Sequence, residues 1–410
     1  MGRRVVITGY GVVAPSGNNS SDFWEGVKEG RNCIDRISHF DLENHKVTMA
    51  AEVRDFVYPD KREARSLDLS SQFAIVAAGE ALEMSGLAAG ENIDPYELGV
   101  YGGTGIGGIG EIEKQAWVAF TKGFKRVSPH LVTMSIPNMV SGNLSIKYNA
   151  KGSSFGLNSA CATGTHALGE AFRNIRDGYQ TAIIAGSSEA PLVSVPFAGF
   201  ENMRAMSQVD DRERCCMPFD KERSGFIMGE GAAFLILEEY EHARARGAEI
   251  LAEFAGYGTA SDAYHITMPD PEGKGDIRSM EMALKDAGLK AEDIDYINAH
   301  GTGTPYNDLY ETNAIKSVFG DHAYKIPVSS TKSITGHSLG AVGSMEAVIC
   351  VKALQEGFVP ATVGLREPDE GLDLDYVQDT GRQAELRCVM SNSLGFGGHN
   401  AAIILRKWEE

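Results

Sequence analysis

The 410-residue chain is 43% hydrophobic and 23% charged, an ordinary globular composition that excludes a disordered tail protein and a coiled coil. Its 38 lysines and arginines against 56 aspartates and glutamates give a net charge of −18, which repels phosphate backbones and excludes nucleic acid as the main partner. No window approaches the ~18 to 20 uninterrupted apolar residues of a membrane helix, and the short apolar run after the basic N-terminus lacks a secretory cleavage site.

Strand-like and helix-like segments alternate along the chain, as in layered α/β proteins. The pattern predicts a strand over residues 4–13 and a helix over residues 70–87. Residues 234–247 predict a strand that leads into a charged helix, without a Pro- or Ser-rich linker. We therefore expect two domains, residues 1–250 and 251–410, that pack as one body.

Three pairs of segments resemble each other across these two domains. They are GYGV (9–12) and GYGT (256–259), residues 76–87 and 278–289, and residues 160–178 and 339–357. Self-similarity of this kind indicates two halves of one duplicated unit.

The glycine-rich segment 105–110 (GIGGIG) matches the G-x-G-x-x-G pattern of dinucleotide-binding loops. That site requires an acidic residue ~20 positions further on, and residues 115–135 contain neither Asp nor Glu. We therefore expect close backbone packing against a ligand or a second chain, and no redox cofactor.

The six cysteines include no C-x-x-C pair, which indicates free thiols in a reducing compartment, and no H-E-x-x-H motif supports a zinc site. Cys161, in NSACATG, directly precedes a predicted amphipathic helix. A thiol at a helix N-terminus meets unpaired N–H groups and the positive end of the dipole, which lower its pKa. The segment alone fits a nucleophile and a small buried core cysteine equally well.

Two histidines occur in motifs of their own. His300, in NAHGTGT, follows a strand-like segment and is placed to face a cleft, although a loop histidine that caps its neighbours is the simpler interpretation of that segment alone. His337 lies five residues after Lys332 in TKSITGHSLG. The same segment matches G-x-S-x-G and offers Ser338 as a rival nucleophile, but the polar residues before it are unlike the strand that such an elbow requires.

Near the C-terminus, the segment 391–400 (SNSLGFGGHN) separates two strand-like runs. Glycines around Phe396 predict a loop that moves a bulky side chain and turns a backbone N–H toward a reacting carbonyl. A plain turn with Phe396 in the core is the alternative.

The motifs NSACATG, NAHGTGT, TKSITGHSLGAVG and GFGGHN together resemble those of the elongation-type β-ketoacyl-[acyl carrier protein] synthases, in the same order and over nearly the whole chain. The resemblance implies an α/β, thiolase-like fold in which two similar halves form a five-layered α-β-α-β-α body. It implies decarboxylative Claisen condensation of a cysteine-bound acyl group with malonyl-[acyl carrier protein] in fatty acid elongation. It requires no cofactor for the chemistry.

Matched position by position, the resemblance also implies residue roles. The catalytic residues would be Cys161 as acyl-accepting nucleophile, His300 and His337 as paired histidines, Lys332 as active-site lysine, and Phe396 as a gate whose N–H joins that of Cys161 in an oxyanion hole. The substrate-binding residues would be Thr302 and Thr304 at the pantetheine arm, Ile106 and Phe200 in the acyl pocket, and Leu394 beside the gate, where many relatives have phenylalanine. A structural monovalent or divalent cation would be held by Asn298, Ala299, Glu346, Ser391 and Asn392.

The partners that the resemblance implies are acyl carrier protein and a second copy of the chain. Because acyl carrier proteins are acidic, the chain needs a local basic patch. The candidates are Lys61, Arg62, Arg65, Lys122, Lys125, Arg126 and Arg204. An ordinary solvated surface explains each of them equally well. The segments around 102–110 and 155–200 are candidates for the homodimer interface.

Three other functions fit parts of the pattern. A polyketide-type ketosynthase would use the same motifs. A noncatalytic partner subunit that binds the carrier protein would share the fold, but Cys161 together with both histidines argues against it. A serine acyltransferase would depend on Ser338. The expected location is the bacterial cytoplasm, or an organelle for a mature organellar form, with no membrane partner.

Overall fold

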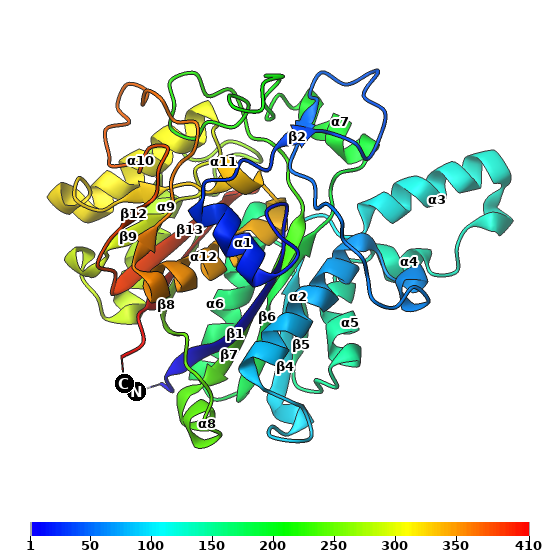
Figure 1. Cartoon of the computed structure of the whole chain (residues 1–410), viewed down its shortest axis with the longest axis horizontal. Coiled ribbons are helices and arrows are strands. Elements are labelled where there is room, and N and C mark those ends of the chain that lie inside the picture. Colours follow the sequence, from blue (N-terminus) through cyan, green and yellow to red (C-terminus); the bar gives the residue numbers. More distant parts are fainter. Residues whose placement is uncertain (1, 410) are drawn as a thin grey trace.

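The computed structural model describes residues 2–409 and builds them around one sheet of ten strands (Figure 1). The strand order is β10-β9-β13-β14-β8-β1-β7-β6-β4-β5. The strands are β1 (Val5–Val13), β4 (Leu98–Gly103), β5 (Ser154–Leu157), β6 (Ala182–Glu189), β7 (Gly231–Glu239), β8 (Ala252–Ser261), β9 (Tyr296–Asn298), β10 (Val328–Ser329), β13 (Cys388–Gly395) and β14 (His399–Arg406). Outside this sheet, β2 (Asp35–Arg36) pairs with β3 (Met49–Ala50), and β11 (Phe358–Val359) pairs with β12 (Arg382–Gln383).

The sheet consists of two groups of five strands with the same topology. In the order β5-β4-β6-β7-β1, the first two pairings are parallel and the last two are antiparallel. The order β10-β9-β13-β14-β8 has the same sequence of pairings. Residues 5–7 of β1 pair with residues 252–254 of β8 and join the two groups. The repeated strand topology agrees with the predicted duplication. The predicted domain boundary after residue 250 falls two residues before β8 and stays a prediction.

Helices lie outside and between these two groups of strands. They are α1 (Ser20–Lys28), α2 (Leu69–Ser85), α3 (Ile109–Lys122), α4 (Leu131–Ser135), α5 (Met139–Lys147), α6 (Thr163–Arg176), α7 (Ser194–Asn202), α8 (Tyr240–Ala245), α9 (Lys274–Ala287), α10 (Pro305–Phe319), α11 (Lys332–Thr335) and α12 (Val342–Glu356). Helices α2 and α5 pack on the first group, α9 packs on the second with α10 beside it, and α6 and α12 pack together in the middle. This is the expected five-layered α-β-α-β-α body.

Each strand packs against two layers of helices, because neighbouring residues of a strand point to opposite faces of the sheet. In β7, Leu235 belongs to the central core around α6 and α12, and Phe234 belongs to the outer core under α2. In β14, Ile403 faces the central core and Ile404 the outer core under α9. Strands buried on both faces explain why β1 and β7 are almost uniformly apolar.

The repeated glycines bring one outer helix onto each group of strands. A Cβ on Gly9 of β1 would lie 2.1 Å from the carbonyl oxygen of Ala81 in α2. At the matching place in the second half, a Cβ on Gly256 of β8 would lie 2.5 Å from the carbonyl oxygen of Ala283 in α9. The GYG repeats therefore reflect the same close strand-to-helix approach in both halves.

The segment around α3 and α4 extends away from the rest of the molecule, and the two ends of the chain lie together at the opposite side (Figure 1). The predicted strand over 4–13 corresponds to β1, and the predicted helix over 70–87 corresponds to α2. Between residues 2 and 409, none of the helices has the length and apolar content needed to cross a membrane.

Candidate active site

Cys161 lies in a tight turn at the start of α6. The preceding residue, Ala160, has a φ of +49°, in the left-handed region that residues with a side chain rarely adopt. The Thr163 hydroxyl closes this turn, because it accepts from the Ser159 N–H at 2.9 Å and donates to the Ala160 carbonyl at 2.7 Å. The backbone thus holds the thiol in one place, where it is only 8% exposed.

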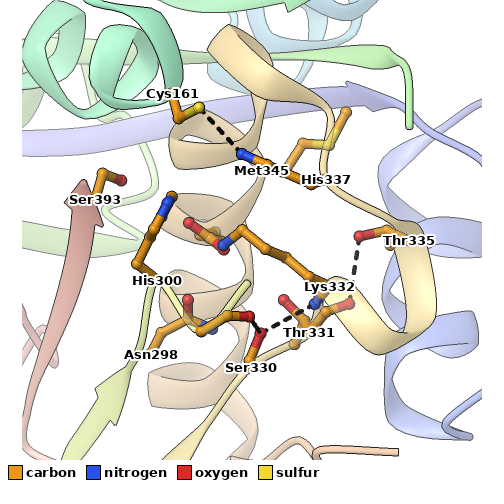
Figure 2. Close-up of polar contacts among 12 residues, drawn as sticks. Cys161, Asn298, His300, Ser330, Thr331, Lys332, Thr335, His337, Met345 and Ser393 are labelled. Atoms are coloured by element: carbon orange, nitrogen blue, oxygen red, sulfur yellow. Dashed lines mark hydrogen bonds and ion pairs between the residues drawn. The ribbon is translucent and has the colours of Figure 1, made fainter. Parts of the chain in front are cut away.

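Two histidines from the second half of the chain lie beside this thiol (Figure 2). His337 Nε2 lies 3.1 Å from Cys161 Sγ. The His300 ring stands at 85° to the His337 ring, with the two centroids 5.4 Å apart. The carboxylate of Glu311, in α10, accepts from the His300 N–H at 2.6 Å and the Gly301 N–H at 2.8 Å, and so fixes the backbone that carries His300.

The protonation states differ from one sequence-based expectation. Burial raises the pKa of the Cys161 thiol to about 12, and the Lys332 charge and the Phe396 N–H oppose this rise only in part. The predicted lowering by the helix N-terminus is therefore wrong, because the thiol is withdrawn from water. Burial, with the nearby Lys332 charge, lowers the pKa of His300 and of His337 well below the usual value, so both imidazoles are neutral at physiological pH.

Lys332 lies in a buried ion pair behind the histidines. Its Nζ is 2.5 Å from Glu346 Oε1, and both side chains are 1% exposed. Burial raises the pKa of Glu346 to about 7, against the lowering effect of the Lys332 ammonium. The Lys332 ammonium contributes, after burial, to the low pKa of both imidazoles.

A cavity opens over the thiol. The sequence-predicted residues that line it are Cys161, Phe200, His300, Thr302, Thr304, His337, Leu394 and Phe396. The Thr302 and Thr304 hydroxyls lie 2.9 Å apart and form part of the polar lining of a mainly apolar cavity. Residues from four separate motifs thus meet at one concave site.

Phe396 is stacked on Phe200, with ring centroids 6.3 Å apart. Its backbone N–H and that of Cys161 both act on the thiol as hydrogen-bond donors that lower its pKa. Ile106 packs in the same apolar cluster as Cys161 and Phe200. These contacts place an aromatic ring and two N–H groups around the sulfur.

The predicted cation-binding residues present unpartnered oxygens. Asn298 of β9 lies next to Ser391 of β13 in the sheet register. The buried oxygens without a hydrogen-bond partner among the described residues include Asn298 Oδ1, Glu346 Oε2, Ser391 Oγ and Asn392 Oδ1. Ala299 follows at the end of β9, where its N–H donates to Ser329 O. An oxygen-only donor group of this kind suits a hard cation, and residues 2–409 hold no cluster of three or more His, Cys, Asp or Glu that could bind a metal.

The seven basic candidates for carrier-protein binding are all exposed, and within residues 2–409 none forms an ion pair. They lie in three places: Lys61, Arg62 and Arg65 before α2; Lys122, Lys125 and Arg126 at the end of α3; and Arg204 after α7. Arg204 is next to Ala205, which lines the cavity.

Ser338 does not form a nucleophile elbow. It follows the short helix α11 rather than a strand, and its hydroxyl donates to Met345 Sδ at 3.4 Å instead of to an imidazole. All six cysteines are free, as expected.

Several residues of the cavity were not predicted from the sequence. Phe226, Asp262, Thr267, Met268 and Leu339 line it together with the predicted residues. Leu339 lies in the motif of His337 but was given no role, and the other four come from segments without a catalytic pattern, so only the tertiary fold brings them to the thiol. Glu311 and Glu189, which hold the surrounding backbone, were missed for the same reason.

Comparison with known proteins agrees with this geometry. Residues 2–243 match the family model "Beta-ketoacyl synthase, N-terminal domain", and residues 251–366 match "Beta-ketoacyl synthase, C-terminal domain". The chain is 46% identical, over 99% of both sequences, to 3-oxoacyl-[acyl-carrier-protein] synthase 2 of Synechocystis.

Solved structures show the same fold. A beta-ketoacyl synthase from Burkholderia phymatum superimposes with a TM-score of 0.92 at 36% identity, over 99% of this chain and 100% of that one. A ketosynthase solved in complex with its type II PKS acyl-carrier protein gives a TM-score of 0.90 at 34% identity, over 100% of both chains. Fold and site thus define a thiolase-like condensing enzyme. The chain belongs to the beta-ketoacyl synthase family.

Proposed function

We propose that the chain is an acyltransferase, a 3-oxoacyl-[acyl carrier protein] synthase that elongates fatty acids by decarboxylative Claisen condensation. The observation that carries the proposal is the contact of Cys161 Sγ with His337 Nε2 at 3.1 Å, with His300 beside it and a mainly apolar cavity above. This arrangement provides one nucleophile, one proton acceptor and two imidazoles that are neutral.

In the first half-reaction, Cys161 Sγ attacks an acyl thioester and its proton passes to His337 Nε2. The proton then goes to the leaving thiolate of the carrier arm, which departs as a thiol, and an acyl thioester remains on Cys161. The backbone N–H groups of Cys161 and Phe396 are the donors for the tetrahedral oxyanion.

In the second half-reaction, malonyl thioester loses CO₂ and becomes an enolate. His300 and His337 donate hydrogen bonds to its oxygen, and its carbon attacks the acyl group on Cys161, whose sulfur leaves. In the part of the chain that the structure describes, neither histidine Nδ1 has a hydrogen-bond partner. No neighbour therefore fixes either tautomer, and His337 Nε2 is able to accept a proton in one half-reaction and to donate in the other.

The basic residues at the ends of α3 and α7 are proposed to bind acidic acyl carrier protein. Their exposure and free charges support this, and the related ketosynthase has been solved with its carrier protein. A homodimer is proposed because β5 is an edge strand and large apolar side chains on it and on the adjacent α5 are exposed, namely Phe155 at 57% and Ile146 at 80%. The cytoplasmic location stays a prediction.

A structural cation is proposed at the unpartnered oxygens of Asn298, Glu346, Ser391 and Asn392, with the Ala299 carbonyl as a further donor. The cation would offset the negative charge of Glu346, and through the Lys332 ion pair it would stiffen the support behind the histidines.

A polyketide-type ketosynthase is the second candidate, because type II ketosynthases are among the structural relatives at 34% identity. The 46% identity to elongation synthases over the full length favours the first proposal.

Intact-protein mass spectrometry tests the proposal. Wild type and Cys161→Ser are mixed with a series of acyl-carrier thioesters, followed by malonyl-carrier protein. We expect a wild-type adduct that disappears on addition of malonyl-carrier protein, with release of a 3-oxoacyl product. An adduct of unchanged lability on Cys161→Ser would reject Cys161 as the nucleophile, and no adduct on either protein would favour the noncatalytic partner subunit.

A further inference from the structure

A buried carboxylate that forms no hydrogen bond with the cysteine or the histidines joins loops from both halves of the chain. Glu189, the last residue of β6, is 0% exposed. One of its oxygens accepts from the N–H groups of Gly105 at 2.6 Å and Gly340 at 3.0 Å. The other accepts from the Thr104 hydroxyl at 2.7 Å and the Ile106 N–H at 3.2 Å. Four donors from two loops therefore depend on one side chain.

These two loops form walls of the pocket that contains the thiol. Ile106 and Leu339 lie in the same apolar cluster as Cys161. Leu339 directly precedes Gly340, lines the cavity and has a strained φ of +45°. A Cβ on Gly340 would lie 2.3 Å from Gly105 N, so the loops touch backbone to backbone. The spacing of the two walls is thus set where both loops meet Glu189.

We infer that Glu189 is a positioning residue that fixes the acyl pocket and so sets the chain-length preference of acyl transfer to Cys161. The inference rests on the function proposed above. Glu189 does not touch the acyl chain itself. It holds the backbone at Ile106 and next to Leu339, and these two side chains border the space that an acyl chain fills. A long acyl chain fits only when both loops keep their spacing, whereas an acetyl group needs only the space next to the sulfur.

Glu189→Gln tests this dependence with little change in size. In one orientation its NH₂ group faces the Gly105 and Gly340 N–H groups, and in the other it faces the Ile106 N–H. Either way, at least one buried donor loses its acceptor and the loop that carries it must move.

The measurement is the rate of acyl-Cys161 formation with thioesters from acetyl to long saturated chains, by quenched intact-protein mass spectrometry. We expect the rate for the chain that wild type prefers, divided by the rate for acetyl, to fall about tenfold in Glu189→Gln. General loss of folded protein lowers both rates equally, so this ratio reports the pocket and not stability.

Two further variants complete the experiment. Thr104→Val removes one of the four donors and should shift the ratio in the same direction by about threefold, and it decides the question if Glu189→Gln does not fold. Glu230→Gln is the matched control, because Glu230 is also buried, accepts from the Val53 N–H at 2.9 Å and lines a different cavity. An unchanged ratio in both Glu189→Gln and Thr104→Val would overturn the inference. A wild type without any adduct would overturn the proposed function, and this inference with it.

Discussion

The turn before α6 and the turn before α12 are the same backbone device in the two repeats. Ala160 and Leu339 both have left-handed φ values, +49° and +45°, and each is the first residue of a short 3-10 turn that leads into a helix. The next residue is Cys161 in the first turn and Gly340 in the second. The first turn presents a thiol, whereas the second packs against Gly105 and brings His337, three residues earlier, to that thiol. One repeat thus supplies the reacting atom, and its copy supplies the histidine.

Removal of the thiol should have the largest effect. Cys161→Ala should lower condensation by more than ~10³-fold and abolish the acyl adduct, because His337 Nε2 then has no sulfur to deprotonate. Product formation and intact mass measure this, and an unchanged melting temperature shows that the turn is intact. An adduct that persists would place the nucleophile elsewhere, with Ser338 as the next residue to test.

The two histidines of the second repeat should separate the half-reactions. His337→Ala should slow acyl transfer and condensation alike, since His337 contacts the sulfur. His300→Ala should slow condensation by about 10²-fold and leave adduct formation nearly unchanged, because its ring contacts His337 rather than the thiol. Single-turnover adduct formation and steady-state product release are compared. Equal loss of adduct in both variants would contradict this division.

The Cys161 thiol, in the turn before α6, should react with alkylating reagents as a buried thiol does. With a pKa of about 12, the fraction of thiolate at Cys161 rises about tenfold per pH unit from pH 7 to 10. The rate of iodoacetamide labelling should follow without a plateau, measured by peptide mass with Cys161→Ser as the control for the other cysteines. A plateau near pH 7 would mean that the helix N-terminus outweighs burial after all.

In the turn before α12, Gly340 follows the left-handed residue Leu339, and we expect this position to tolerate no side chain. Gly340→Ala should destabilise the protein by about 1–3 kcal/mol, because its Cβ would meet Gly105 N at 2.3 Å. Gly199→Ala is the control: this exposed helical glycine has open space around its Cβ position, and the change should be neutral or stabilising. Urea denaturation compares them, and equal midpoints would show that the loops separate at no cost.

The smallest expected effect lies at the surface. The double change Lys125→Glu with Arg126→Glu should raise KM for carrier-bound substrate about threefold at low salt. KM for a small acyl-pantetheine thioester is the control and should stay constant. A parallel rise for both substrates would place the effect in the cavity rather than in carrier-protein binding.

Local patterns were sufficient for much of the fold. The buried strand β1 and helix α2 follow directly from apolar runs and helix periodicity, and the GYG repeats identify the paired halves, because the same close strand-to-helix contact requires glycine in each. The motifs around Cys161, His300 and His337 were recognised for a related reason. Each combines a reactive side chain with the small residues that a tight turn needs.

What the sequence determined by itself is therefore the list of parts: the duplicated α/β unit, the family, and the reactive residues within their turns. Only the tertiary structure decided how these parts act together. Burial reversed the expected pKa shift of Cys161, because the solvation of a thiolate depends on every surrounding layer and not on its own helix. Likewise, Glu189 became visible only where β6 meets loops from both halves, since a carboxylate between distant backbone donors leaves no local pattern in the sequence.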